Sequence, residues 1–165
     1  MSEALEPWKD FNVAMVGATA ALAGLLIVAM SVNISTIMTS ATLPARAGAS
    51  VATLVLAIVA CAFGLVPGQP VALYGVEVLV GAVVAAVFQA HSMRVLATKD
   101  RVSTPWGRFA KAAVGVLPLL GFLVGGVLVV AGVAPAGLAF VALGSVLAVI
   151  TSILLAWVVL VEVLR

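Results

Sequence analysis

Residues 71–94 read VALYGVEVLVGAVVAAVFQAHSMR, an apolar run long enough to cross a bilayer that carries one carboxylate, Glu77, within it. A charged side chain at the centre of a membrane helix costs about 2.5–3.5 kcal/mol on insertion scales. Ionisable residues in such helices therefore usually mark a functional site or a contact with a partner. Glu77 is the first candidate for a functional residue.

The composition of the whole chain is that of an integral membrane protein. Of its 165 residues, 65% are hydrophobic and 8% are charged, and the mean hydropathy is +1.35. A span takes about 20 residues, so this length accommodates five spans with short connections and no separate soluble domain. The sequence predicts an all-α fold with a single transmembrane domain over residues 1–165 and helices at about 11–38, 47–66, 71–94, 106–132 and 135–164.

The reactive residue types are too few for most enzymes. The chain has one cysteine, Cys61, and one histidine, His91, which excludes a disulfide framework and a zinc site built from these residue types. It also lacks a Ser/His/Asp set and a glycine-rich loop after a strand. We expect a protein that is not an enzyme and that needs no cofactor. Because the basic residues are spread among the loops, nucleic acid is not an expected partner.

The basic residues decide the expected orientation in the membrane. Arg46, Arg165 and the five basic residues between positions 94 and 111 fall on one side of a five-span topology, and only Lys9 falls on the other. The positive-inside rule places the larger group in the cytoplasm. The sequence therefore predicts an external N-terminus, a cytoplasmic C-terminus and a multi-pass location in the cell (inner) membrane of a bacterium.

Glu77 and His91 share one face of the third predicted helix, together with Gly81, Val84 and Phe88. Fourteen residues separate the two titratable groups, which is about 21 Å at 1.5 Å per residue, so they can border one hydrated path without touching. Glu77 is read either as an ion, proton or ligand site or as a structural carboxylate. His91 is read either as the inner end of that path or as an interfacial histidine.

Three neutral polar residues complete the candidate pathway. Gln89 lies near His91 and serves either the pathway or hydrogen bonding between helices. Ser31 and Asn33 belong to a polar cluster at the end of the first helix, which either bonds to other helices or water or lines a ligand path. No basic residue is expected within a span to form a salt bridge with Glu77.

Small residues at helical spacing predict close contacts between helices. Gly17 and Gly24 lie on one face of the first helix, and Gly121 and Gly125 form a G-x-x-x-G pair in the fourth. The candidate packing residues are Gly17, Gly24, Gly81, Gly121, Gly125, Gly144 and Ser152.

Several stretches of the first half carry a family resemblance. The runs MVGATAALAGLLIVAMSVNI, LPARA and LVPGQP, followed by Glu77, resemble small actinobacterial membrane proteins often labelled modulator of FtsH protease. The similarity covers about residues 8–80, and the alanine- and valine-rich composition is compatible with a GC-rich bacterium. The resemblance implies an accessory role at a membrane protease.

Two functions remain open for this membrane protein. The first is a homo-oligomeric pore or transport protein for ions or protons, with Glu77 as its intramembrane polar site and small-residue stripes joining the copies. The second is a non-conducting accessory or scaffold subunit, which needs another membrane protein as its partner. Short external turns and the absence of a charged pore ring or an internal repeat favour the second. The lipid bilayer surrounds the chain in both cases.

Overall fold

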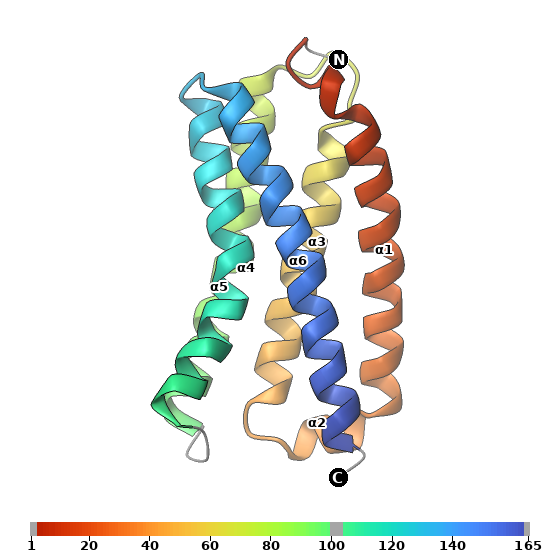
Figure 1. Ribbon diagram of the computed structural model, residues 1–165, viewed down its shortest axis with the longest axis vertical. Coiled ribbons are helices and arrows are strands. Elements are labelled where there is room, and N and C mark those ends of the chain that lie inside the picture. Colours follow the sequence, from red (N-terminus) through yellow and green to blue (C-terminus); the bar gives the residue numbers. More distant parts are fainter. Residues whose placement is uncertain (1–2, 100–103, 164–165) are drawn as a thin grey trace.

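The computed structural model describes residues 3–99 and 104–163 as a bundle of long helices (Figure 1). The elements are η1 (Glu6–Trp8), α1 (Lys9–Val32), α2 (Ile34–Thr39), α3 (Leu43–Phe63), α4 (Val71–Lys99), α5 (Pro105–Val130) and α6 (Ala134–Val163). Within this described part, five helices are long and apolar enough to cross a membrane. The predicted all-α fold and the predicted number of spans are confirmed.

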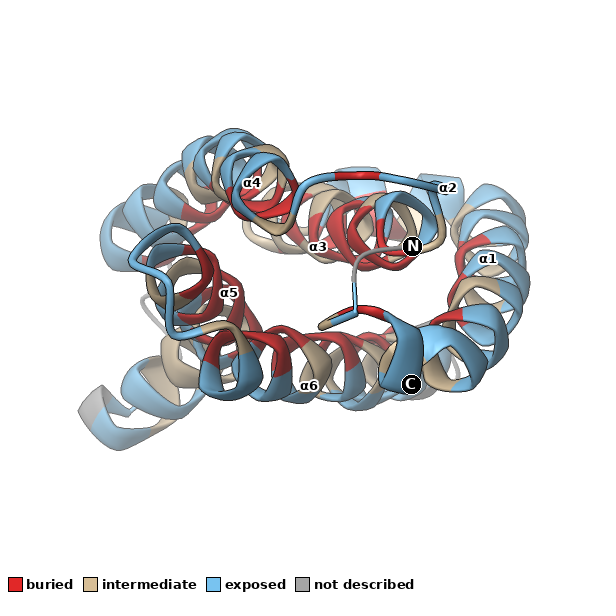
Figure 2. Ribbon diagram, turned by 90° about the horizontal axis from the view of Figure 1, so that it is seen from above, coloured by how far each residue is buried: buried red, intermediate tan, exposed pale blue. Residues whose placement is uncertain are grey.

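The five long helices run alongside one another (Figures 1 and 2). Helix α1 forms one edge of the bundle, α3 and α6 lie in the middle, and α4 and α5 form the opposite edge. The N-terminus and the turns after α3 and α5 lie at one end, called here the N-terminal end, and α2 lies at the other, called the α2 end. The side of the membrane that each end faces is still a prediction, based on the distribution of the basic residues.

Three helix ends differ from their predicted positions by four or more residues. Helix α1 stops before Asn33, which leaves the helical conformation (φ −106°, ψ 19°) and donates its side-chain amide to the carbonyl of Ala29 at 2.9 Å. Helix α3 begins at Leu43 rather than 47, because Pro44 lies in its first turn, where a missing N–H leaves no hydrogen bond unmade. Helix α4 continues to Lys99 rather than ending at 94.

Helices α5 and α6 pack backbone against backbone. A β-carbon built on Gly121 would lie 2.7 Å from Cα of Gly144, and one built on Gly125 would lie 2.7 Å from the carbonyl oxygen of Gly137. Backbone atoms cannot rotate away as side chains can. Glycine at 121 and 125 is therefore what allows this approach of the two helices.

Gly81 and Ser152 lie where α3 meets α4 and α6. A β-carbon on Gly81 would lie 2.8 Å from Cδ1 of Leu56, which is the end of a flexible side chain. The hydroxyl oxygen of Ser152 lies 3.0 Å from that of Ser50, within hydrogen-bond distance. Both residues are thus at contacts between helices.

Gly17 and Gly24 do not pack against another described helix of this chain, so the close contact expected at α1 is not made within the chain. Both residues are exposed, and a β-carbon built at either position meets nothing within 4 Å. The buried face of α1 is formed instead by Thr19, Ala23 and Leu26. At 100° per residue this face lies opposite the two glycines, so the small-residue face of α1 points outward.

Candidate functional site

One face of α3 carries polar side chains at helical spacing. Arg46, Ser50 and Thr53 occupy successive turns, and Cys61 continues the same face after Ala57. Thr53, Ala57 and Cys61 are each at most 5% exposed, so this face points into the bundle. The sequence of α3 therefore places polar groups along the protein interior.

Two polar contacts join this face to α6. Ser50 and Ser152 share a hydrogen bond of 3.0 Å, and Sγ of Cys61 lies 3.8 Å from Oγ of Ser145. The Ser145 hydroxyl also donates to the carbonyl of Val141 at 3.0 Å. A buried hydroxyl left without a partner costs about 1–3 kcal/mol, so these contacts favour one register of α3 against α6.

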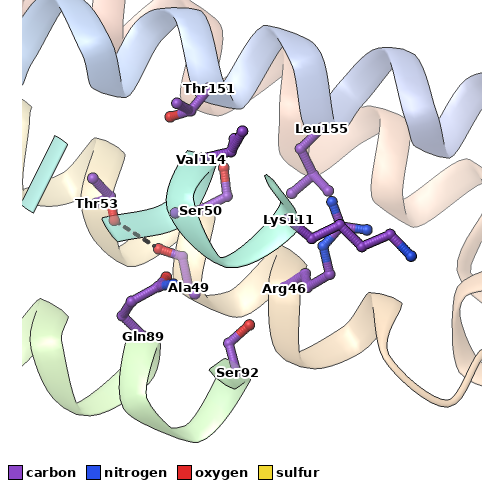
Figure 3. Close-up of a pocket in the computed structure, with 11 residues that line it drawn as sticks. Arg46, Ala49, Ser50, Thr53, Gln89, Ser92, Lys111, Val114, Thr151 and Leu155 are labelled. Carbon is purple, nitrogen blue, oxygen red and sulfur yellow. Dashed lines mark hydrogen bonds between the residues drawn. The ribbon is translucent and has the colours of Figure 1, made fainter. Parts of the chain in front are cut away.

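A polar cavity of about 40 Å³ lies at the α2 end of this face, between α3, α4, α5 and α6 (Figure 3). At about 10–15 Å³ per water, it has room for about three water molecules. Its lining consists of Arg46, Ala49, Ser50, Thr53, Gln89, Ser92, Lys111, Val114, Gly115, Thr151 and Leu155. The cavity is thus a polar site within a bundle whose core is otherwise mainly apolar.

Two basic residues, Arg46 of α3 and Lys111 of α5, line the cavity. Both are half-buried, and Figure 3 shows their side chains at the same edge of the cavity. The expectation that no basic residue lies within a span is therefore wrong. Because α3 begins at Leu43, Arg46 belongs to its first turn, and Lys111 lies in the second turn of α5.

Neutral hydrogen-bonding groups surround the same cavity. Gln89 and Ser92 of α4 are buried and line it, and the Gln89 amide occupies the space above Gly115, where a β-carbon would collide with it. The hydroxyl of Thr53 donates to the carbonyl of Ala49 at 2.9 Å, the dashed line in Figure 3. Side chains from four helices therefore converge on one small volume.

Glu77 lies near the N-terminal end of the bundle and does not line this cavity. It is half-buried, and its Oε2 accepts a hydrogen bond from Nε2 of Gln69 in the turn between α3 and α4. Gln69 is 5% exposed, and its Oε1 has no hydrogen-bond partner among the described residues. The carboxylate is thus bound by a side-chain amide from the turn that precedes α4.

Of the five residues predicted to form a pathway, Gln89 alone lines the cavity. His91 is exposed on the outer surface of α4. Ser31 and Asn33 donate to backbone carbonyls of α1 four residues earlier in the chain, at 2.8 and 2.9 Å. The residues that the sequence analysis missed, Arg46 above all, could have been found by extending the polar spacing of α3 back by one turn.

A second and smaller cavity of about 10 Å³ lies near the N-terminal end, where Asn12, Tyr74 and Ser145 contribute polar groups. Between the two cavities is an apolar layer whose members are each at most 1% exposed: Ala57, Val78, Ala82, Phe122 and Ala148. In this conformation, the layer separates the polar interior into two compartments.

A metal site is not apparent in this interior. Among the described residues, no group of three or more His, Cys, Asp or Glu is placed to hold a metal ion.

Comparison of the chain with known protein families, characterised proteins and solved structures found no match.

Proposed function

We propose that the protein is a small membrane transport protein that binds an anionic solute in the cavity lined by Arg46 and Lys111. The observation that carries this proposal is that basic side chains from two helices line one polar cavity inside an apolar bundle. Ionisable residues within a membrane bundle are costly and commonly mark an ion or substrate path. Arg and Lys in such a path favour anions.

The neutral groups of the cavity support the same choice of solute charge. The side-chain amide of Gln89 lines the cavity and carries N–H donors, whereas the Thr151 hydroxyl donates to the carbonyl of Ala148 at 3.3 Å and the Ser50 hydroxyl is paired with that of Ser152. An anion that leaves water must regain both hydrogen bonds and opposite charge. The Gln89 amide and the two basic side chains of the lining are groups of these two kinds.

The size of the cavity favours a small solute. A volume of about 40 Å³ fits a monatomic or small polyatomic anion better than an organic acid. The apolar layer blocks passage toward the N-terminal end, so transport requires α5 and α6 to shift relative to α3 and open that layer. The proposed solute site is thus inside a single chain and away from Glu77. Assembly of several copies remains a prediction.

Anion flux from liposomes tests this function. Purified protein is reconstituted into vesicles loaded with chloride or nitrate, and efflux is measured with a halide electrode or a quenched dye. Arg46→Gln and Lys111→Gln each remove one charge-assisted interaction of about 1.5–3 kcal/mol, so flux should fall about 10- to 150-fold. Arg94→Gln is the matched control, because Arg94 is an exposed cation of α4 that does not line the cavity.

Glu77→Gln separates this proposal from a path through Glu77. The variant should conduct anions as the unchanged protein does, because Glu77 is not at the cavity. Equal flux in the unchanged protein and in both cavity variants would refute the anion site. Flux that is lost in Glu77→Gln and unchanged in both cavity variants would instead place the transport path at Glu77.

A second candidate function is a non-conducting accessory subunit of a membrane complex, such as the protease modulator that the family resemblance implies. The outward small-residue face of α1 favours it, because Gly17 and Gly24 leave room for a helix of another protein. Absence of flux for every anion tested, together with loss of a co-purified partner in Gly17→Leu, would support this function over transport.

A further inference from the structure

A groove on the surface of the bundle runs along α3 between α1 and α4. Its deeper half has a volume of about 570 Å³ and is lined almost entirely by apolar atoms, among them those of Met30, Val55 and Gly81. Several of the apolar side chains flanking it are well exposed, including Val55 at 48%. This half lies beside the middle of α3.

The groove changes character toward the α2 end. There a second volume of about 590 Å³ is lined by Thr39, Ser40, His91 and Lys99 together with apolar residues. Gly48 and Phe88 line both volumes, so the two halves are continuous. The groove therefore runs from a polar and cationic mouth into an apolar interior.

The groove is long enough to hold a lipid molecule of one leaflet of a bilayer. From Gly81 to Lys99 along α4 is 18 residues, or about 27 Å at 1.5 Å per residue. One leaflet with its headgroups is about 20–22 Å deep, half of the total bilayer thickness. The long axis and the polarity gradient of the groove thus follow those of a lipid molecule in that leaflet.

We propose that this groove binds one anionic phospholipid, with the headgroup phosphate at Lys99 and His91 and an acyl chain in the apolar half. Lys99 supplies the positive charge, and the hydroxyl of Ser40, which accepts from the backbone N–H groups of Thr42 and Leu43, lines the same volume with its O–H donor. Basic pockets at the ends of membrane helices are known to select anionic headgroups. The site is independent of the cavity between α3 and α6, with which it shares no lining residue.

Gly48 provides a variant that fills the groove. A β-carbon built on Gly48 meets nothing within 4 Å, and the residue lines both halves, so a leucine side chain would occupy the junction without displacing a helix. Gly17→Leu is the matched control, because its built β-carbon is equally unobstructed and lies outside the groove.

Native mass spectrometry measures the lipid directly. The purified protein is delipidated in detergent and titrated with phosphatidylglycerol or phosphatidylcholine. We expect one tightly bound phosphatidylglycerol in the unchanged protein and in Gly17→Leu, and its loss in Gly48→Leu. Lys99→Gln should lower the preference for phosphatidylglycerol about fivefold, the effect of one basic residue at an anionic surface. Arg94→Gln, which removes an exposed charge outside the groove, should keep that preference.

Three outcomes would overturn the proposal. Equal lipid binding by Gly48→Leu and Gly17→Leu would show that the bound lipid lies elsewhere on the bundle. Dissociation of an oligomer in Gly48→Leu, with lipid binding unchanged, would assign the groove to a second copy of the chain. If Gly48→Leu does not fold, the test of the site is the comparison of Lys99→Gln with Arg94→Gln. An equal preference for phosphatidylglycerol in these two variants refutes the site.

Discussion

Replacing Gly121 with alanine tests the contact between α5 and α6. The added carbon would lie 2.7 Å from Cα of Gly144, whereas ordinary contact begins at 3.4 Å, so the helices must separate by at least about 0.7 Å. Overpacking of this kind costs about 1–3 kcal/mol. Gly17→Ala adds the same carbon where nothing lies within 4 Å and should stabilise α1 by about 0.5–1 kcal/mol.

The comparison of the two alanine variants isolates the free-energy cost of overpacking between α5 and α6, because both substitutions gain the same helix propensity. Reversible unfolding in mixed detergent and dodecyl sulfate, followed by circular dichroism, gives the free energy of each variant. Gly121→Ala should be less stable than Gly17→Ala by about 1–3 kcal/mol. Equal stability of the two variants would show that α5 and α6 do not meet through this glycine.

Three further predictions concern the N-terminal end, the interior and the topology. Gln69→Leu should lower the free energy of unfolding by about 1–3 kcal/mol in the same assay, because Glu77 loses its amide donor; an unchanged value would contradict the contact. Cys61, at 1% exposed, should react with a maleimide only after denaturation, and rapid labelling of the native protein would refute its burial. In intact cells an impermeant maleimide should label Gly68→Cys and spare Ala97→Cys; the reverse pattern would invert the predicted orientation.

The sequence predicted the spans well because a bilayer requires long apolar helices whatever their neighbours are. It predicted poorly which face of each helix points into the bundle. In a membrane both the lipid-facing and the protein-facing sides of a helix are apolar, so the amphipathic pattern that orients a helix in a soluble protein is weak. Gly17 with Gly24 and Gly121 with Gly125 each share one helix face, yet among the described residues only the second pair meets another helix of the chain.

The candidate cavity was missed because of one helix boundary. The helix predicted at 47–66 left Arg46 outside it, although proline in the first turn starts a helix and Pro44 lies in the first turn of α3. Once α3 begins at Leu43, Arg46 and Ser50 fall on the same face as Thr53. Their convergence with Lys111 also depends on how α5 packs against the rest of the bundle, and residue spacing within one helix carries no such information.

The hydrogen bond between Ser50 and Ser152 has a consequence for biosynthesis. The two residues are 102 positions apart, so at about 5–20 residues per second the ribosome needs about 5–20 s to supply the second after the first. During that interval α3 has left the ribosome with an arginine and several hydroxyls on a face that α6 does not yet cover. That face must be sheltered by the insertion machinery, by water or by the lipid headgroups until translation ends. A delay in chain elongation before α6 would then expose nascent protein to membrane quality control.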